Sequence, residues 1–144
     1  MTRPSGSRKI VSIAGGGPQR DLLECRIEED SGAALLHVSG EVDLFTAPLL
    51  RSHLELLVQQ GKNVAVVLTD VRFIDMAGIR TLEHCHRLAE ERGSRVVLAS
   101  PSAMVRRVFE ILGIHRTFDI LPTPVAALGH LRSGTFSEGA PGDG

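Results

Sequence analysis

The chain of 144 residues contains no tryptophan and no tyrosine, and its aromatic content of 3% consists of five phenylalanines. Because aromatic rings provide the stacking platforms for bases and sugars and the cages for quaternary cations, this scarcity argues against those ligands. The 16 basic and 17 acidic residues give a net charge of -1. Such a balance argues against direct binding of nucleic acid or of an anionic membrane through a basic surface.

Long apolar runs and cysteines are also scarce. The longest apolar run is about five residues, whereas a membrane-spanning helix needs about 20. No basic-then-apolar leader opens the chain. The two cysteines, Cys25 and Cys85, are too few for a disulfide framework, and we expect buried thiols in a reducing cytosol. These absences predict a cytoplasmic protein without membrane insertion.

The two ends differ in composition from the middle. Residues 1–20 carry four basic and no acidic residues, and we interpret them as a flexible basic arm; a short edge strand over residues 10–13 is the alternative. Residues 133–144 are rich in Gly, Ser and Pro and predict a flexible tail. The length suits one domain, which we place at residues 21–132.

Hydrophobic periodicity predicts an alternation of strands and helices in this domain. We expect strands near residues 23–27, 34–38, 64–68, 96–99 and 118–120. We expect helices near residues 47–60, 77–92, 101–112 and 124–131. The order ββαβαβαβα predicts an α/β domain whose mixed sheet has about five strands, beginning with an antiparallel hairpin, and about four helices.

Some local details follow from helix-start signals and apolar spacing. Thr46 is placed to cap the first helix, with Pro48 in its first turn, and Ser100 is placed to cap the third. The third helix is expected to bury a stripe of five residues. Its members are Met104, Val105, Val108, Ile111 and Leu112.

Ligands and partners of α/β sheets bind beyond the carboxyl ends of the parallel strands. After the strand at 64–68, the chain reaches Phe73 and Ile74, which we expect to be part of the core. Asp75 follows them, just before the second helix, and suits the N-cap of that helix. Asp43 leaves the second strand; it suits either a solvated turn or a second carboxylate on the same rim as Asp75. Gly78 costs a helix about 1 kcal/mol relative to Ala, so it indicates either tight internal packing or close approach by a partner.

Several segments in order resemble the STAS domain, as found in bacterial anti-sigma-factor antagonists. The resemblance spans residues 22–131. It rests on Gly-Glu-Val-Asp at 40–43 followed by Thr-Ala-Pro at 46–48, on Phe-Ile-Asp-Met-Ala-Gly-Ile at 73–79, and on Pro-Ser at 101–102 with the helix at 105–114.

The resemblance implies partner switching. Such antagonists bind an anti-sigma factor, often an ATP-binding serine kinase, and so release a sigma factor. The kinase phosphorylates the second serine of an Asp-Ser-Ser-Gly motif, and the added charge alters the docking surface. Here the two serine positions hold Met76 and Ala77, so there is no phosphoacceptor at the usual position. Thr69, Thr81 and Ser102 are nearby hydroxyls outside that position.

Two consequences of this departure stay open: a constitutive antagonist, or a STAS scaffold subunit of another complex, such as a lipid-transport machine or a stress-signalling assembly. The strand-end Asp common in the family falls on Val67, a second departure. We expect a binding protein without cofactor or metal. The expected partner-binding residues are Asp43, Thr46, Asp75, Met76, Ala77, Gly78, Arg80, Ser102 and Arg106.

Two other classes fit less well. A phosphorelay receiver needs a late lysine, but the only lysines are Lys9 and Lys62. A catalytic or metal site could use Cys85 with its neighbours His84 and His86. On a helix, however, adjacent side chains do not face each other, and zinc-binding pairs are four residues apart.

Overall fold

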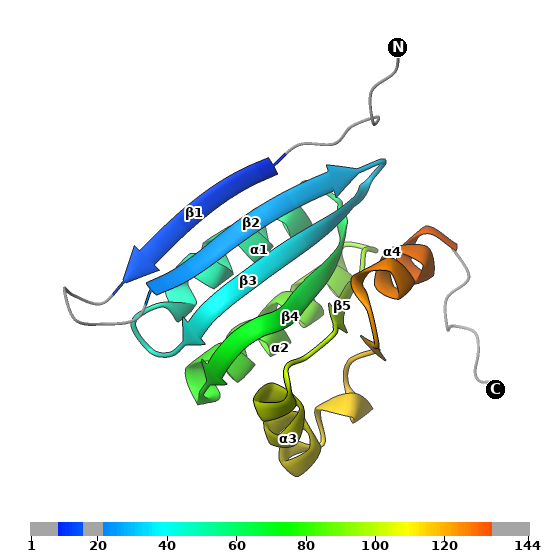
Figure 1. Cartoon of the computed structure of the whole chain (residues 1–144). Helices are drawn as coiled ribbons and strands as arrows, with labels where there is room; N and C mark the ends of the chain where they lie inside the picture. Colours follow the sequence, from blue (N-terminus) through cyan, green and yellow to red (C-terminus); the bar gives the residue numbers. More distant parts are fainter. Residues whose placement is uncertain (1–8, 16–21, 134–144) are drawn as a thin grey trace.

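The fold is built around one mixed β-sheet. The computed structural model describes residues 9–15 and 22–133. Six strands follow one another in sequence order across the sheet (Figure 1). The first two pairings are antiparallel and the remaining three are parallel. The strands are β1 (Lys9–Gly15), β2 (Leu22–Asp30), β3 (Ala33–Val42), β4 (Asn63–Ile74), β5 (Val96–Ala99) and β6 (Ile120–Leu121).

The helices cover the sheet unequally. The helical elements are α1 (Ala47–Gln59), α2 (Met76–Glu91), α3 (Ala103–Leu112), the 3-10 turn η1 (Ile114–Arg116) and α4 (Pro124–Ser133). Helices α1 and α2 lie together on one face, and α4 lies on the other (Figure 1). The predicted α/β class, mixed sheet and opening hairpin are confirmed. None of the helices in the described segments is both long and apolar enough to cross a bilayer.

The apolar run in β4 explains why the sheet has a core on both faces. Val64, Val66 and Leu68 join the main core under α1 and α2, whereas Ala65 and Val67 join the smaller core under α4. Each fully buried aliphatic side chain contributes about 1.5–3 kcal/mol, so this strand is a main source of stability.

The amino-terminal segment departs from expectation. Lys9–Gly15 forms β1 and pairs antiparallel with β2, from Lys9↔Glu28 to Gly15↔Leu22. For residues 9–15 the structure therefore shows the alternative, an edge strand that is longer than the expected 10–13, and not the flexible arm. The sheet gains one strand. The physical reason is that β2 would otherwise present unpaired backbone groups, which a β-branched segment can satisfy. Residues 1–8, 16–21 and 134–144, which contain the rest of the arm and nearly all of the expected tail, lie outside the described residues.

Strand β4 is longer than the sequence predicts. It continues past Leu68 to Ile74, because β3 offers a partner as far as Val42. The pairing contains a register shift after His37, and β4 exposes two consecutive polar residues there before Val71 returns to the core. Ile74 is buried as expected, but Phe73 is exposed, so its assignment to the core is wrong.

Helix α3 begins later and buries less than expected. Its N-cap is Ser102, whose Oγ accepts the Val105 N–H at 3.3 Å; Ser100 instead has a left-handed backbone with φ of 53°. The predicted core stripe is also wrong for Met104, Ile111 and Leu112, which are exposed. Because α3 packs mainly against β4 and η1, it buries only a narrow row formed by Val105 and Phe109.

Gly78 packs the start of α2 directly onto the strand ends. A Cβ added at Gly78 would lie 2.7 Å from a Cγ1 atom of both Val42 and Ile74. The N–H of Asp75 also donates to the Val42 carbonyl at 3.1 Å. Of the two explanations for this glycine, tight internal packing is the one the structure supports.

We predict that Gly78→Ala destabilises the fold. Overpacking costs about 1–3 kcal/mol, and the gain in helix propensity offsets about 1 kcal/mol of this cost. The free energy of unfolding should therefore fall by up to about 2 kcal/mol. The matched control is Gly129→Ala in α4, where an added Cβ meets nothing within 4 Å. Urea denaturation should show a lower free energy of unfolding for Gly78→Ala and a higher one for Gly129→Ala. Equal changes in the two variants would contradict the packing argument.

We also predict that removing β1 promotes self-association. Deletion of residues 1–15 leaves β2 as an uncovered edge strand, so sedimentation velocity should show concentration-dependent oligomers. Deletion of residues 1–8 alone keeps β1 and is the control. A monomeric 1–15 deletion across the same concentrations would show that β1 does not protect this edge.

Candidate functional site

Two carboxylates leave the sheet side by side. Strands β3 and β4 are parallel neighbours, and their last residues, Val42 and Ile74, are paired in register. Asp43 and Asp75 follow them directly and so share one rim of the sheet. This rim is where α/β folds generally place ligands or partners.

The carboxylate of Asp43 organises the turn that follows β3. Its Oδ1 accepts the N–H groups of Phe45 and Thr46, both at 3.0 Å. The Thr46 hydroxyl accepts the Asp43 N–H at 3.0 Å and donates to the Glu41 carbonyl at 2.7 Å. These reciprocal bonds fix the turn, and Thr46 is buried within it.

Thr46 does not cap α1 with its hydroxyl, which corrects the expected role. It occupies the N-cap position, but its backbone has φ of -98° and ψ of -19°, and no side-chain capping bond forms. Capping by a side chain requires an extended backbone at this position. The hydroxyl is turned back toward β3 instead, because the Asp43 carboxylate already orders the turn.

Asp75 caps α2, as expected. Its Oδ1 accepts the N–H of Ala77 at 2.8 Å and that of Gly78 at 3.3 Å, and its backbone is extended. Such a cap stabilises a helix by about 1 kcal/mol. The N–H groups of Ala77 and Gly78 are therefore already satisfied by the Asp75 carboxylate.

Apolar side chains lie exposed around these two carboxylates. The Asp43 turn presents Leu44 and Phe45, which are 70% and 60% exposed. Met76, the first residue of α2, is 43% exposed. The set that we name the rim patch is Leu44, Phe45, Phe73, Met76 and Met104. Exposed apolar groups gathered at one rim are typical of a surface that binds another protein.

Helix α3 joins this rim through Ser102. The Ser102 N–H donates to the Leu68 carbonyl at 3.2 Å, and its Oγ donates to the Val71 carbonyl at 2.7 Å. These bonds hold the start of α3 beside the second half of β4 (Figure 1). Met104 is the second residue of α3. Ser102 therefore positions the surface by internal bonds.

The remaining predicted site residues lie farther along the helices. Arg80 is exposed one turn after Met76 on α2, and Arg106 is exposed on the outer side of α3. Sequence reasoning missed Leu44 and Phe45 altogether. Their signal is that two apolar residues stand between Asp43 and Thr46, in a turn without helical or strand periodicity.

A groove runs between α1 and α2 from this rim. Its volume is about 540 Å³, and Leu44, Pro48, Ala77, Arg80 and Arg87 are among its lining residues. Beside it, Glu55 Oε2 receives Arg51 Nε at 2.7 Å and lies 2.9 Å from His84 Nε2. Hydrogen bonding from Arg51, and secondarily from His84, lowers the pKa of Glu55.

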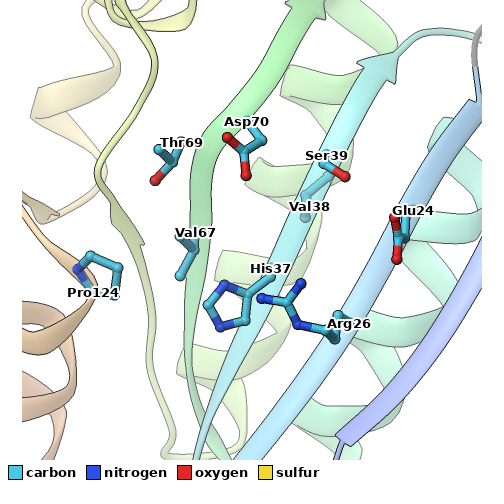
Figure 2. A pocket seen from close by; sticks show the side chains of 9 residues that line it. All are labelled: Glu24, Arg26, His37, Val38, Ser39, Val67, Thr69, Asp70 and Pro124. Atoms are coloured by element: carbon cyan, nitrogen blue, oxygen red, sulfur yellow. The ribbon is translucent and has the colours of Figure 1, made fainter.

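A second hollow lies on the opposite face of the sheet, near α4 (Figure 2). It has a volume of about 200 Å³ and is lined by Glu24, Arg26, His37 and Asp70, among others. His37 Nε2 lies 3.0 Å from Glu28 Oε1. Acidic and basic groups alternate here, so the hollow has no dominant charge with which to select a ligand.

The histidine–cysteine run on α2 does not form a reactive centre. Cys85 is fully buried, and desolvation by burial, with a smaller effect of Glu55, raises the pKa of its thiol to about 12. His84 faces Glu55, whereas His86 packs against Phe118. Among the residues that the structure describes, no group of three or more His, Cys, Asp or Glu side chains is arranged to hold a metal.

Comparison with known proteins gives one consistent family. The family model of the STAS domain matches residues 24–127. The anti-sigma-B factor antagonist of Listeria monocytogenes is 31% identical over 94 residues, which are 65% of this chain and 82% of that relative. The anti-sigma-F factor antagonist RsfB of Mycobacterium tuberculosis is 26% identical over 117 residues, 79% of this chain and 93% of the relative.

Solved structures agree on the fold. The anti-sigma factor antagonist SpoIIAA in its unphosphorylated form has a TM-score of 0.66 at 21% identity, over 78% of this chain and 99% of that one. An anti-sigma factor antagonist from Mycobacterium paratuberculosis has a TM-score of 0.68 at 24% identity, over 76% and 94% of the two chains. The match of the family model begins at residue 24 and leaves β1 outside. By its sequence match and its fold, the chain belongs to the STAS domain family.

Proposed function

We propose that this protein is an anti-sigma-factor antagonist: it binds an anti-sigma factor, of the serine-kinase type, in the cytoplasm and so releases a sigma factor. It acts by binding and not by catalysis. The observation that carries the proposal is the rim patch, an apolar surface held at the carboxyl ends of β3 and β4. Relatives from Bacillus, Listeria and Mycobacterium that are named as such antagonists support it.

The rim patch is suited to binding because the turn that carries two of its residues is preorganised. Leu44 and Phe45 sit on a turn that Asp43 and Thr46 have already fixed by hydrogen bonds. A partner therefore gains apolar contact without first ordering a loop. Four of the five residues of the rim patch are Phe or Met, and both types are enriched in protein–protein interfaces.

The same site lacks the group through which a kinase partner would inactivate it. Met76 and Ala77 carry no hydroxyl, and the Thr81 hydroxyl is buried and donates to the Ala77 carbonyl at 3.0 Å. The Ser102 hydroxyl is likewise engaged with the Val71 carbonyl. This arrangement supports an antagonist that stays permanently competent to bind.

The absent hydroxyl also favours one alternative. A STAS domain released from kinase control could serve as a scaffold subunit of another complex, such as a lipid-transport machine or a stress-signalling assembly. Co-purification from the source cell separates the two: an anti-sigma factor supports the antagonist, whereas recovery of a transporter ATPase or permease supports the scaffold.

We predict that Leu44→Asp and Met76→Asp each weaken binding to the anti-sigma factor by about 10-fold or more, because each places a charge in an apolar contact. The control is Val125→Asp, which changes an exposed apolar residue of α4, the helix on the other face of the sheet. Titration calorimetry with the purified partner gives the comparison. Unchanged affinity of both rim variants would reject the rim patch as the binding surface.

We predict that the unaltered protein gains no phosphate at residues 75–78 when it is incubated with its kinase partner and ATP. Ala77→Ser restores a hydroxyl at the start of α2 and should become phosphorylated. Ala103→Ser, which adds a hydroxyl at the start of α3, is the control and should stay unmodified. Intact-mass and peptide mass spectrometry locate the phosphate. Its appearance on Thr69 or Thr81 of the unaltered protein would overturn the constitutive model.

A further inference from the structure

The groove between α1 and α2 opens directly from the rim patch. Leu44 of the rim patch lines the groove, together with Pro48 on the α1 side and Ala77 on the α2 side. The apolar surface at the rim thus continues into the space between the two helices. A partner that covers the rim patch has this groove as its nearest extension.

Farther along α2 the groove becomes basic. Arg80 and Arg87 both line it, are exposed, and make no ion pair within the described residues. Arg51 also lines it, but Glu55 holds that guanidinium at 2.7 Å. Glu83 is the one carboxylate of the lining, and it pairs with neither free arginine. Two arginines are therefore available against a single carboxylate.

The spacing of the two arginines matches a second helix. They are seven residues apart on α2, so they lie on one face, about 10.5 Å apart along the axis. Carboxylates seven residues apart on an opposing helix have the same spacing. A groove between two helices also provides the ridges between which a third helix packs.

We propose that this groove receives an acidic amphipathic helix of the anti-sigma factor. Its apolar residues pack at the Leu44 end, and two carboxylates seven residues apart pair with Arg80 and Arg87. The proposal rests on the proposed function and deepens it, because it states the chemistry of the partner segment. The occupant is protein, since the apolar end offers nothing to a phosphate chain and Glu83 would repel one.

The test uses the full chain and two synthetic helical peptides of about 18 residues. Both carry leucines at one end; one has glutamates seven residues apart along the same face, and the other has lysines at those positions. Fluorescence anisotropy should show that the glutamate peptide binds the unaltered protein at least about 10-fold more tightly than the lysine peptide. Absence of this preference would overturn the proposal.

Charge reversal locates the site. The double variant Arg80→Glu/Arg87→Glu should lose the preference for the glutamate peptide and favour the lysine peptide. The control, Arg92→Glu/Arg116→Glu, makes the same change in net charge at exposed arginines that do not line the groove, and it should keep the original preference. Equal effects of the two double variants would mean that only overall charge matters, and would reject the groove as the site.

The same variants separate this inference from the proposed function. If the anti-sigma factor binds the unaltered protein and the Arg80→Glu/Arg87→Glu variant equally well, the groove inference fails and the antagonist function stands. If no anti-sigma factor binds but the glutamate peptide shows the groove-dependent preference, the function fails and the acidic-helix site stands.

Discussion

The parallel pairing of β3 with β4, which brings Val42 opposite Ile74, is the constraint on which the rest of this structure depends. Because Val42 and Ile74 end their strands together, the turn after β3 and the start of α2 emerge at the same place. Gly78 then lets α2 approach until its backbone touches both strand-end side chains. The positions of the rim patch, the groove and the α2 cap all depend on this junction between the two strand ends and α2. A change in the pairing of β3 with β4 would therefore displace these proposed binding residues together.

At this junction the polar side chains form internal hydrogen bonds, whereas large apolar side chains are exposed. The side chains of three polar residues form hydrogen bonds with backbone N–H and carbonyl groups: Asp43, Thr46 and Asp75. Three apolar side chains beside them are exposed to solvent: Leu44, Phe45 and Met76. Folding alone does not favour exposing large apolar side chains, although single cases are common. A cluster of them, carried by polar residues that work as scaffolding, is what a standing protein-binding surface requires.

The sequence predicted what depends on periodicity. The strand at 64–68, the helix near 77–92 and the opening hairpin follow from hydrophobic spacing, and the Asp75 cap follows from its place before that helix. It did not predict features set by a distant neighbour. The length of β4 depends on β3, and the shallow burial of α3 depends on how little of the sheet lies beneath it. The sequence offered an edge strand at residues 10–13 only as an alternative, because its formation depends on the open edge of β2.

The candidate site shows the same division. Asp75 was recognisable from the sequence because it stands just before a predicted helix, and Asp43 because it comes after a predicted strand. Phe73 and Met104 were assigned to the core because apolar residues usually belong there. Their exposure is decided by the bulge in the β3–β4 pairing and by the bonds from Ser102 to β4. Local pattern carries no information about either contact.

The hydrogen-bonded turn at Asp43 also has a consequence for the timing of association. A loop that must become ordered before it can dock slows productive encounter, whereas in the proposed complex the Asp43 turn needs no such ordering because four hydrogen bonds hold it. Encounter then becomes limited by diffusion and orientation. Differences in affinity among competing partners would then come mainly from their dissociation rates. The partner whose complex has the longest residence time would remain bound.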